Sequence, residues 1–138
     1  MTDPVVITGA GSGIGRSIAQ TLAKNGFSLL LLGRNLENLQ ATKKLLKNPE
    51  QHQCQACDIR SSGEIRQALA NVSSLYALIA NAGLGGESQY GEQDRWQEVI
   101  DTNLTGTYQT IQECLPLIKK SSAPYKKVVI ISPILARL

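Results

Sequence analysis

Several classes of protein are excluded by what this 138-residue sequence has little of. Its 3 Cys, at positions 54, 57 and 114, are too few and too unevenly spaced for a disulfide framework. Strongly apolar runs such as Leu29 to Leu32 are far shorter than the ~20 residues that a membrane-spanning helix requires. The first residues lack the basic and apolar regions of a secretory signal. We therefore expect a cytoplasmic protein with no membrane segment.

Aromatic residues and net charge are also scarce, at 4% and +3. A nucleic-acid-binding surface usually combines a basic stripe with stacking aromatics, so we expect no nucleic-acid partner. The content of 42% hydrophobic and 18% charged residues excludes a disordered chain. The length suits one hydrophobic core, and we expect residues 1–138 to form a single domain.

Short apolar runs alternate along the chain with amphipathic stretches. The pattern predicts strands over 4–8, 27–33, 51–57, 75–80 and 128–131, and helices over 14–25, 36–46, from 61 onward, 88–96 and 101–119. We expect Ile14 and Leu36 to face inward, and Pro116 to kink or end its helix. Continuous rather than alternating apolar strands favour an α/β fold with a doubly wound, Rossmann-like parallel sheet that stops after its fifth strand.

The motif that carries chemistry is the run Thr8-Gly9-Ala10-Gly11-Ser12-Gly13-Ile14-Gly15, between the first predicted strand and helix. A glycine-rich turn lets phosphate oxygens approach the backbone, and the following helix presents unpaired N–H groups to them. The glycine spacing fits neither a strict G-x-G-x-x-G nor a P-loop, and it matches T-G-x-x-x-G-x-G.

This spacing resembles that of the short-chain dehydrogenase/reductase family, which consists of nicotinamide-dependent oxidoreductases with a Rossmann fold. Three further segments match in order: Asp58-Ile59, which resembles the adenine-contacting pair, the N-A-G motif Asn81-Ala82-Gly83, and the proton-relay asparagine Asn103. The resemblance implies a catalytic role for Asn103 and cofactor contacts from Thr8, Gly9, Gly11, Ser12, Gly13, Ile14, Gly15, Arg34, Asp58, Ile59, Asn81, Ala82 and Gly83.

Taken without the resemblance, three of these residues have simpler interpretations. Asn81 would hold neighbouring strands together, Asn103 would cap or kink a helix, and Asp58 would be an ordinary turn residue. These interpretations stay open.

The second predicted strand ends in Gly33-Arg34, with no acidic residue before Glu37. An acid at this point would bind the ribose hydroxyls of NAD and repel the 2′-phosphate of NADP. Arg34 could instead form a charge-assisted contact with that phosphate, or it could be a solvated loop charge. The sequence therefore predicts that NADP(H) is preferred, with NAD(H) as the alternative cofactor.

The resemblance also implies a Tyr-x-x-x-Lys pair and a serine that protonate the reacting alkoxide, and this sequence contains no such pair. Pro133 stands at the serine position, and strand alternation points the neighbouring Ser132 elsewhere. The family would oxidise or reduce at a CH–OH carbon with NAD(P). For this truncated-looking chain we expect dinucleotide binding without catalysis, and a non-enzymatic nucleotide-binding or interaction protein or an inactive gene fragment is the alternative.

Two features bear on partners and metals. The helix over 101–119 resembles a subunit-contact helix, so a homo-oligomer is expected through Asp101 to Lys119, while an exposed apolar last strand predicts poor folding of the chain alone. Cys54 and Cys57 form a C-x-x-C, but strand alternation places them on opposite faces, and zinc would have to recruit His52 and Cys114 as well. We expect no metal site.

Overall fold

The computed structural model describes residues 3–84 and 94–132. Its centre is one five-stranded sheet, in which every strand runs parallel to its neighbours in the order β3-β2-β1-β4-β5. The strands are β1 (Val5–Thr8), β2 (Leu29–Gly33), β3 (Gln53–Ala56), β4 (Ala77–Ala80) and β5 (Lys127–Ile130). This arrangement confirms the predicted doubly wound, Rossmann-like sheet.

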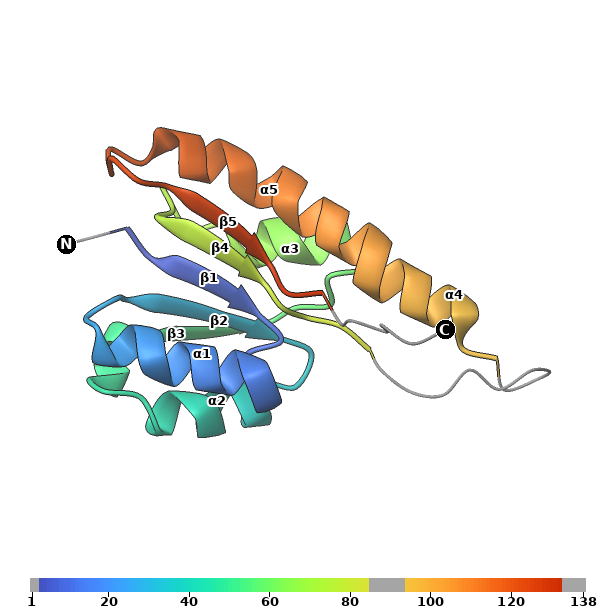
Figure 1. Cartoon of the computed structure of the whole chain (residues 1–138), viewed down its shortest axis with the longest axis horizontal. Coiled ribbons are helices and arrows are strands. Elements are labelled where there is room, and N and C mark those ends of the chain that lie inside the picture. The colour runs from blue at the N-terminus through green and yellow to red at the C-terminus, as the bar shows by residue number, and fades with distance from the viewer. Residues whose placement is uncertain (1–2, 85–93, 133–138) are drawn as a thin grey trace.

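Helices cover both faces of the sheet (Figure 1). On one face pack α1 (Gly13–Lys24) and α2 (Leu36–Lys44), and on the other pack α3 (Ser62–Ala68) and α5 (Thr107–Lys120). The central strands are buried on both sides because successive residues alternate between the two cores: Leu29 and Leu31 face α1 and α2, whereas Leu30 and Leu32 face α3 and α5. These continuous apolar strands are the pattern from which we predicted a parallel sheet covered on both faces.

The helical segment after β4 differs from the two separate helices that we expected. It runs without a break from α4 (Trp96–Ile100) through a π-helix (Asp101–Gly106) into α5. Residues 85–93 lie outside the described part of the chain, but Asp94 and Arg95 precede the helix rather than belong to it. Proline removes one backbone donor, yet α5 continues through Pro116 to Lys120, so the expected end at this residue is wrong.

Two predicted core residues are wrong for a shared reason. Ile14 and Leu36 are exposed by 62% and 46%, although helical periodicity placed both on inward faces. Each lies in the first turn of a helix that begins at the carboxyl edge of the sheet. The deeper residues Ala19 and Leu39 of the same helices are fully buried, as the pattern predicted. Trp96, the first residue of α4, is also 65% exposed.

None of the described helices is both long and apolar enough to cross a membrane.

Candidate cofactor site

The glycine-rich loop leaves the carboxyl end of β1 and turns directly into α1. Gly9 and Gly13 have φ angles of +63° and +51°, which side chains with a Cβ rarely adopt. Gly15 packs against the loop, since a Cβ there would overlap the carbonyl oxygen of Gly9. Within the described chain, no side chain caps the first turn of α1 and no acidic residue lies in it. The loop thus presents free N–H groups to an anion.

Thr8 and Asn81 fix the loop to the neighbouring strand β4. The Thr8 hydroxyl accepts hydrogen bonds from the backbone N–H groups of Asn81 (3.0 Å) and Ala82 (2.9 Å). The Asn81 amide donates to the carbonyl oxygens of Thr8 (3.2 Å) and Gly9 (3.3 Å). Thr8 is buried, and both side chains bind backbone groups of the two strand ends, as the structural interpretation of Asn81 predicts.

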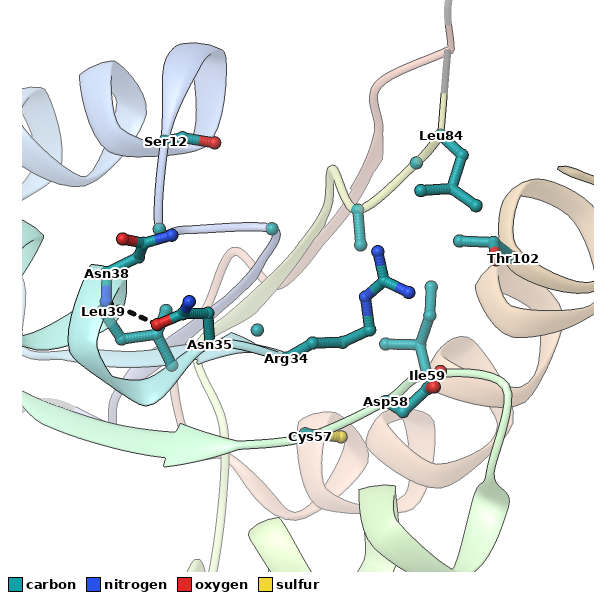
Figure 2. Close-up of a pocket in the computed structure, with 15 residues that line it drawn as sticks. Ser12, Arg34, Asn35, Asn38, Leu39, Cys57, Asp58, Ile59, Leu84 and Thr102 are labelled. Atoms are coloured by element: carbon teal, nitrogen blue, oxygen red, sulfur yellow. Dashed lines mark hydrogen bonds between the residues drawn. The ribbon is translucent and has the colours of Figure 1, made fainter. Parts of the chain in front are cut away.

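The glycine loop forms one wall of a cleft at the carboxyl ends of β1 to β4. Among the residues predicted from the sequence, Gly9, Gly11, Ser12, Arg34, Asp58, Ile59, Ala82 and Gly83 line it. Figure 2 shows Arg34 reaching from the end of β2 across the cleft, toward the side where Ile59, Leu84 and Thr102 lie. None of the ion pairs between described residues involves Arg34, so its charge is available to a ligand in this cleft.

Asp58 is engaged by a residue that sequence reasoning missed. The Arg60 guanidinium donates to both carboxylate oxygens of Asp58, at distances of 2.7 to 3.1 Å, and the Arg60 backbone N–H donates to one of them. These bonds lower the pKa of Asp58, to which the charge of Arg34 contributes further. The carboxylate is therefore ionised, and both of its oxygens are bound by Arg60 rather than by Arg34. The Asp-x-Arg spacing in the turn after β3 could have predicted this ion pair from the sequence.

Asn103 lies in the π-helix and binds the chain segment that follows β4. Its amide donates to the carbonyl oxygen of Leu84 (2.9 Å), and its side-chain oxygen accepts from the Leu84 N–H (2.7 Å). Gly83 makes this approach feasible, since a Cβ there would lie 3.2 Å from the Asn103 oxygen. Asn103 therefore ties the helix to the end of β4.

A second cleft adjoins the first and shares Ala82, Gly83 and Leu84 with it. Ile14, Asn81, Asn103 and Ser132 line it, which brings together residues from four separate parts of the sequence. We expected Ser132 to point away, but β5 ends at Ile130, and strand alternation therefore does not extend to residue 132. Pro133 lies outside the described residues.

Other lining residues had no motif to mark them. In the first cleft these are Asn35, Asn38, Leu39, Cys57, Leu84 and Thr102, and in the second Leu84, Thr107, Ile130 and Ile131. Their positions follow from the packing of α2 and the π-helix, which residue spacing alone does not specify.

The cysteines show no features of a redox or metal site. Cys54 packs on the α1 and α2 face of the sheet, whereas Cys57 packs on the opposite face. Burial raises the pKa of Cys54, that of Cys57 to about 11 and that of Cys114 to about 12. A thiol with a raised pKa is a poor nucleophile and a poor metal ligand at neutral pH. The described residues contain no cluster of three potential metal ligands.

Together the sheet order and the glycine loop define a dinucleotide-binding type of α/β fold. The family model of the short chain dehydrogenases matches residues 3–137. The chain therefore belongs to the short chain dehydrogenase family.

Individual relatives agree with this assignment. Sulfoacetaldehyde reductase of Chromohalobacter salexigens is 38% identical over 125 residues, which cover 86% of this chain and 49% of that protein. Oxidoreductase YciK of Escherichia coli, which is uncharacterized, is 34% identical over 130 residues, covering 86% of this chain and 52% of its own. The chain thus spans about half the length of the curated relatives it matches.

Solved structures share the fold. An alcohol dehydrogenase from Thermococcus sibiricus, complexed with 5-hydroxy-NADP, superposes with a TM-score of 0.81 at 25% identity, covering 94% of this chain and 57% of that one. A variant of actinorhodin polyketide ketoreductase, solved with NADPH, superposes with a TM-score of 0.75 at 33% identity, covering 83% of this chain and 46% of that one.

Proposed function

We propose that the cleft binds a nicotinamide dinucleotide and that NADP(H) is preferred over NAD(H). The observation that carries this proposal is that Arg34 and the glycine loop line one cleft, with no acidic side chain at the end of β2. The loop and the start of α1 would hold the pyrophosphate, and Arg34 would bind the 2′-phosphate. Two similar solved structures, one with 5-hydroxy-NADP and one with NADPH, support this proposal by analogy.

Within this site, each set of residues has a distinct task. Thr8 and Asn81 hold the loop in shape, and Arg60 keeps Asp58 from competing for Arg34. Ile59 and Ala82 supply apolar surface for the adenosine half of the dinucleotide. Gly83 lets the chain turn toward the second cleft, where Asn103 lies.

In the whole protein, we propose hydride transfer between the nicotinamide and a substrate carbon: the reduced dinucleotide would donate hydride to a carbonyl, and the oxidised one would accept hydride from an alcohol. The second cleft is where such a substrate would lie, beside Asn103 and Ser132. For residues 1–138 as a single domain we propose dinucleotide binding alone. The alternative, a non-enzymatic nucleotide-binding or interaction protein, predicts that the whole protein also oxidises no NADPH with any of a panel of ketones, whereas hydride transfer predicts oxidation with at least one.

The cofactor preference is tested by titrating the purified chain with NADPH and with NADH. We expect NADPH to bind more tightly, and Arg34→Ala to weaken it about 10- to 100-fold while changing NADH little, because a charge-assisted contact is lost. Arg66→Ala is the matched control. It removes an arginine of α3 that pairs with Glu113 of α5 and lines neither cleft. Equal affinities for the two nucleotides, or an Arg34→Ala variant that binds both as before, would refute the preference.

We also propose that the protein is cytoplasmic. Copies of the chain would associate through the helical segment from Asp101 to Lys119. Leu104 and Tyr108 on this segment are exposed by 64% and 62%, and paired helices would bury them. Light scattering coupled to size exclusion should give a mass above 14.9 kDa, and Leu104→Glu should lower it. A monomeric wild-type chain would contradict this proposal.

A further inference from the structure

Arg16, in the first turn of α1, is half-buried and pairs with no carboxylate. None of the ion pairs between described residues involves it. Instead its Nη2 atom donates to the carbonyl oxygen of Gly11 (2.7 Å), and its Nε atom donates to the Thr42 hydroxyl (2.9 Å). A cation is unfavourable at the amino-terminal end of a helix, because that end is already positive. The guanidinium is thus committed to the backbone of the glycine loop and to α2.

Thr42 of α2 completes this contact. Its side chain is fully buried, and its hydroxyl accepts from Arg16 while donating to the carbonyl oxygen of Ala10 (2.9 Å). Figure 1 shows α1 and α2 side by side on one face of the sheet. Arg16 and Thr42 therefore join both helices to the glycine loop through two of its carbonyl groups.

These two carbonyl groups belong to consecutive peptide units of the loop. In a trans peptide the carbonyl oxygen and the N–H point in opposite directions, and the described residues contain no cis peptide. The hydrogen bond to the Ala10 carbonyl therefore directs the N–H of Gly11 away from Thr42. The hydrogen bond to the Gly11 carbonyl likewise directs the N–H of Ser12 away from Arg16. Gly11 and Ser12 line the first cleft, whereas Arg16 and Thr42 do not.

The two N–H groups that are oriented in this way are free. No hydrogen bond to another described residue uses the N–H of Gly11 or that of Ser12. The preceding N–H, that of Ala10, donates to the Leu32 carbonyl oxygen (3.2 Å). Gly11 also packs on α2, since a Cβ there would lie 3.1 Å from the Cβ of Asn38. The loop is thus held by β2 and the two helices, while two of its donors remain available.

We propose that Arg16 and Thr42 are positioning residues, which hold the N–H groups of Gly11 and Ser12 toward phosphate oxygens of the bound dinucleotide. This inference rests on the proposed function and adds to it two residues that line neither cleft. A loop that already has its binding conformation loses less conformational freedom when the ligand binds. Arg16 and Thr42 are therefore predicted to raise affinity without touching the ligand.

The first test uses Thr42→Val, which removes the hydroxyl with little change of shape, and Thr42→Ser, which keeps it. We expect Thr42→Val to weaken NADPH binding about three- to tenfold and Thr42→Ser to bind within about twofold of the wild type. Thr110→Val is the matched control. Thr110 is also buried and donates to a backbone carbonyl, that of Gly106, and it lines neither cleft. This control should lower the unfolding temperature to a similar extent and leave affinity unchanged.

Arg16→Lys separates orientation from charge. Lysine keeps the positive charge, but an ammonium group does not reproduce the two directed hydrogen bonds of a guanidinium. We expect Arg16→Lys to weaken NADPH binding about as much as Thr42→Val does, and the double variant to lose little more than either, because both residues act on one loop. If Arg16→Lys and Thr42→Val both bind NADPH as the wild type does, the positioning role is refuted.

Amide NMR would follow the two donors directly. NADPH should move the amide proton signals of Gly11 and Ser12 downfield in the wild type and less in Thr42→Val, a difference that lost stability alone would not produce. Equal shifts in both proteins would contradict the proposed orientation.

Fragments of the cofactor show which phosphate is bound. Weaker binding of ADP-ribose by Thr42→Val would place the two N–H groups at the pyrophosphate, and weaker binding of adenosine 2′-monophosphate would place them at the ribose phosphate. Unchanged binding of both fragments would overturn the inference. If the wild type binds neither NADPH nor NADH, the proposed function itself fails. If it binds NADPH and the variants of Arg16 and Thr42 bind equally well, only this inference fails.

Discussion

Asn81 donates two hydrogen bonds to Thr8, one from its backbone N–H to the Thr8 hydroxyl and one from its side-chain amide to the Thr8 carbonyl oxygen. Thr8 ends β1, and Asn81 follows the last residue of the adjacent parallel strand β4. These bonds therefore join the two strands at the edge of the sheet where the glycine loop begins. These hydrogen bonds therefore fix the start of the glycine loop.

Thr8→Val should destabilise the chain by about 1–3 kcal/mol, because two backbone N–H groups lose their acceptor near the core. Chemical denaturation would measure this free energy of unfolding. Thr8→Ser keeps the hydroxyl and should lose much less. A Thr8→Val variant as stable as the wild type would show that water replaces the hydroxyl.

His52 is a buried structural residue rather than a metal ligand. Its Nδ1 atom accepts from the Leu29 N–H (3.2 Å) and its Nε2 atom lies 2.8 Å from the Lys47 carbonyl oxygen, so the ring joins the start of β2 to the chain after α2. His52→Phe fills similar space but leaves both backbone groups unpaired, and we expect a loss of about 2 kcal/mol in the free energy of unfolding. Added zinc should change neither protein's melting temperature, and a rise in the wild type alone would contradict this view.

The ion pair of Asp58 with Arg60 predicts a pH-dependent difference in stability. The pKa of Asp58 is lowered in the folded state, so the pair stabilises the protein above the pKa of the unfolded chain, and this contribution is lost as the pH falls through the folded value. Arg60→Gln should raise the pKa of Asp58, as followed by carboxyl NMR. Its stability should approach that of the wild type at acidic pH. Arg66→Gln should leave the Asp58 titration where it was.

Thiol reactivity should follow burial. Cys54 is half-buried, whereas Cys57 and Cys114 are buried and have pKa values raised to about 11 and about 12. In the folded chain at pH 8, a thiol reagent should therefore modify Cys54 first, and Cys54→Ser should remove the fast phase. Rapid modification of all three residues would indicate that the core opens. A disulfide between Cys54 and Cys57 should not form, because the two lie on opposite faces of the sheet.

The strand β5 exposes Val128, Val129 and Ile130 by 39%, 37% and 54%. Exposed apolar strands at a sheet edge promote association, and charged residues suppress it. Val129→Lys should therefore lower the self-association of the chain, as measured by light scattering over a concentration series. Leu45→Lys replaces an apolar residue that is more exposed than Val129, at 56%, but lies outside any strand, and it should have little effect. Equal scattering from both variants and the wild type would contradict the prediction.

Much of the fold was predictable because each buried strand appears in the sequence as a continuous apolar run and the glycine loop lies between the first strand and the first helix. The motif residues around Gly9, Asp58 and Ala82 do lie together, since parallel strands end at a common edge. These features depend on local patterns.

The rest depends on packing between distant segments. Periodicity cannot show that the first turns of α1 and α2 extend past the sheet, and so it misplaced Ile14 and Leu36. It also could not reveal the π-helix, in which Gly106 packs closely against Ile59. Thr102 lies in that segment and carried no sequence signal.

The π-helix also makes this stretch intolerant of changes in length. Its hydrogen bonds reach five residues along rather than four, and α-helical segments continue on both sides of it. A π-helical turn holds one residue more than an α-helical turn, so deleting one residue between Asp101 and Gly106 would restore α-helical spacing and remove this wider turn, while α4 and α5 keep their relative orientation. Thr102 and Asn103 could then not both keep their places beside Ile59 and Leu84. In evolutionary terms, we expect the number of residues in this helical segment to be conserved, because both contacts depend on it.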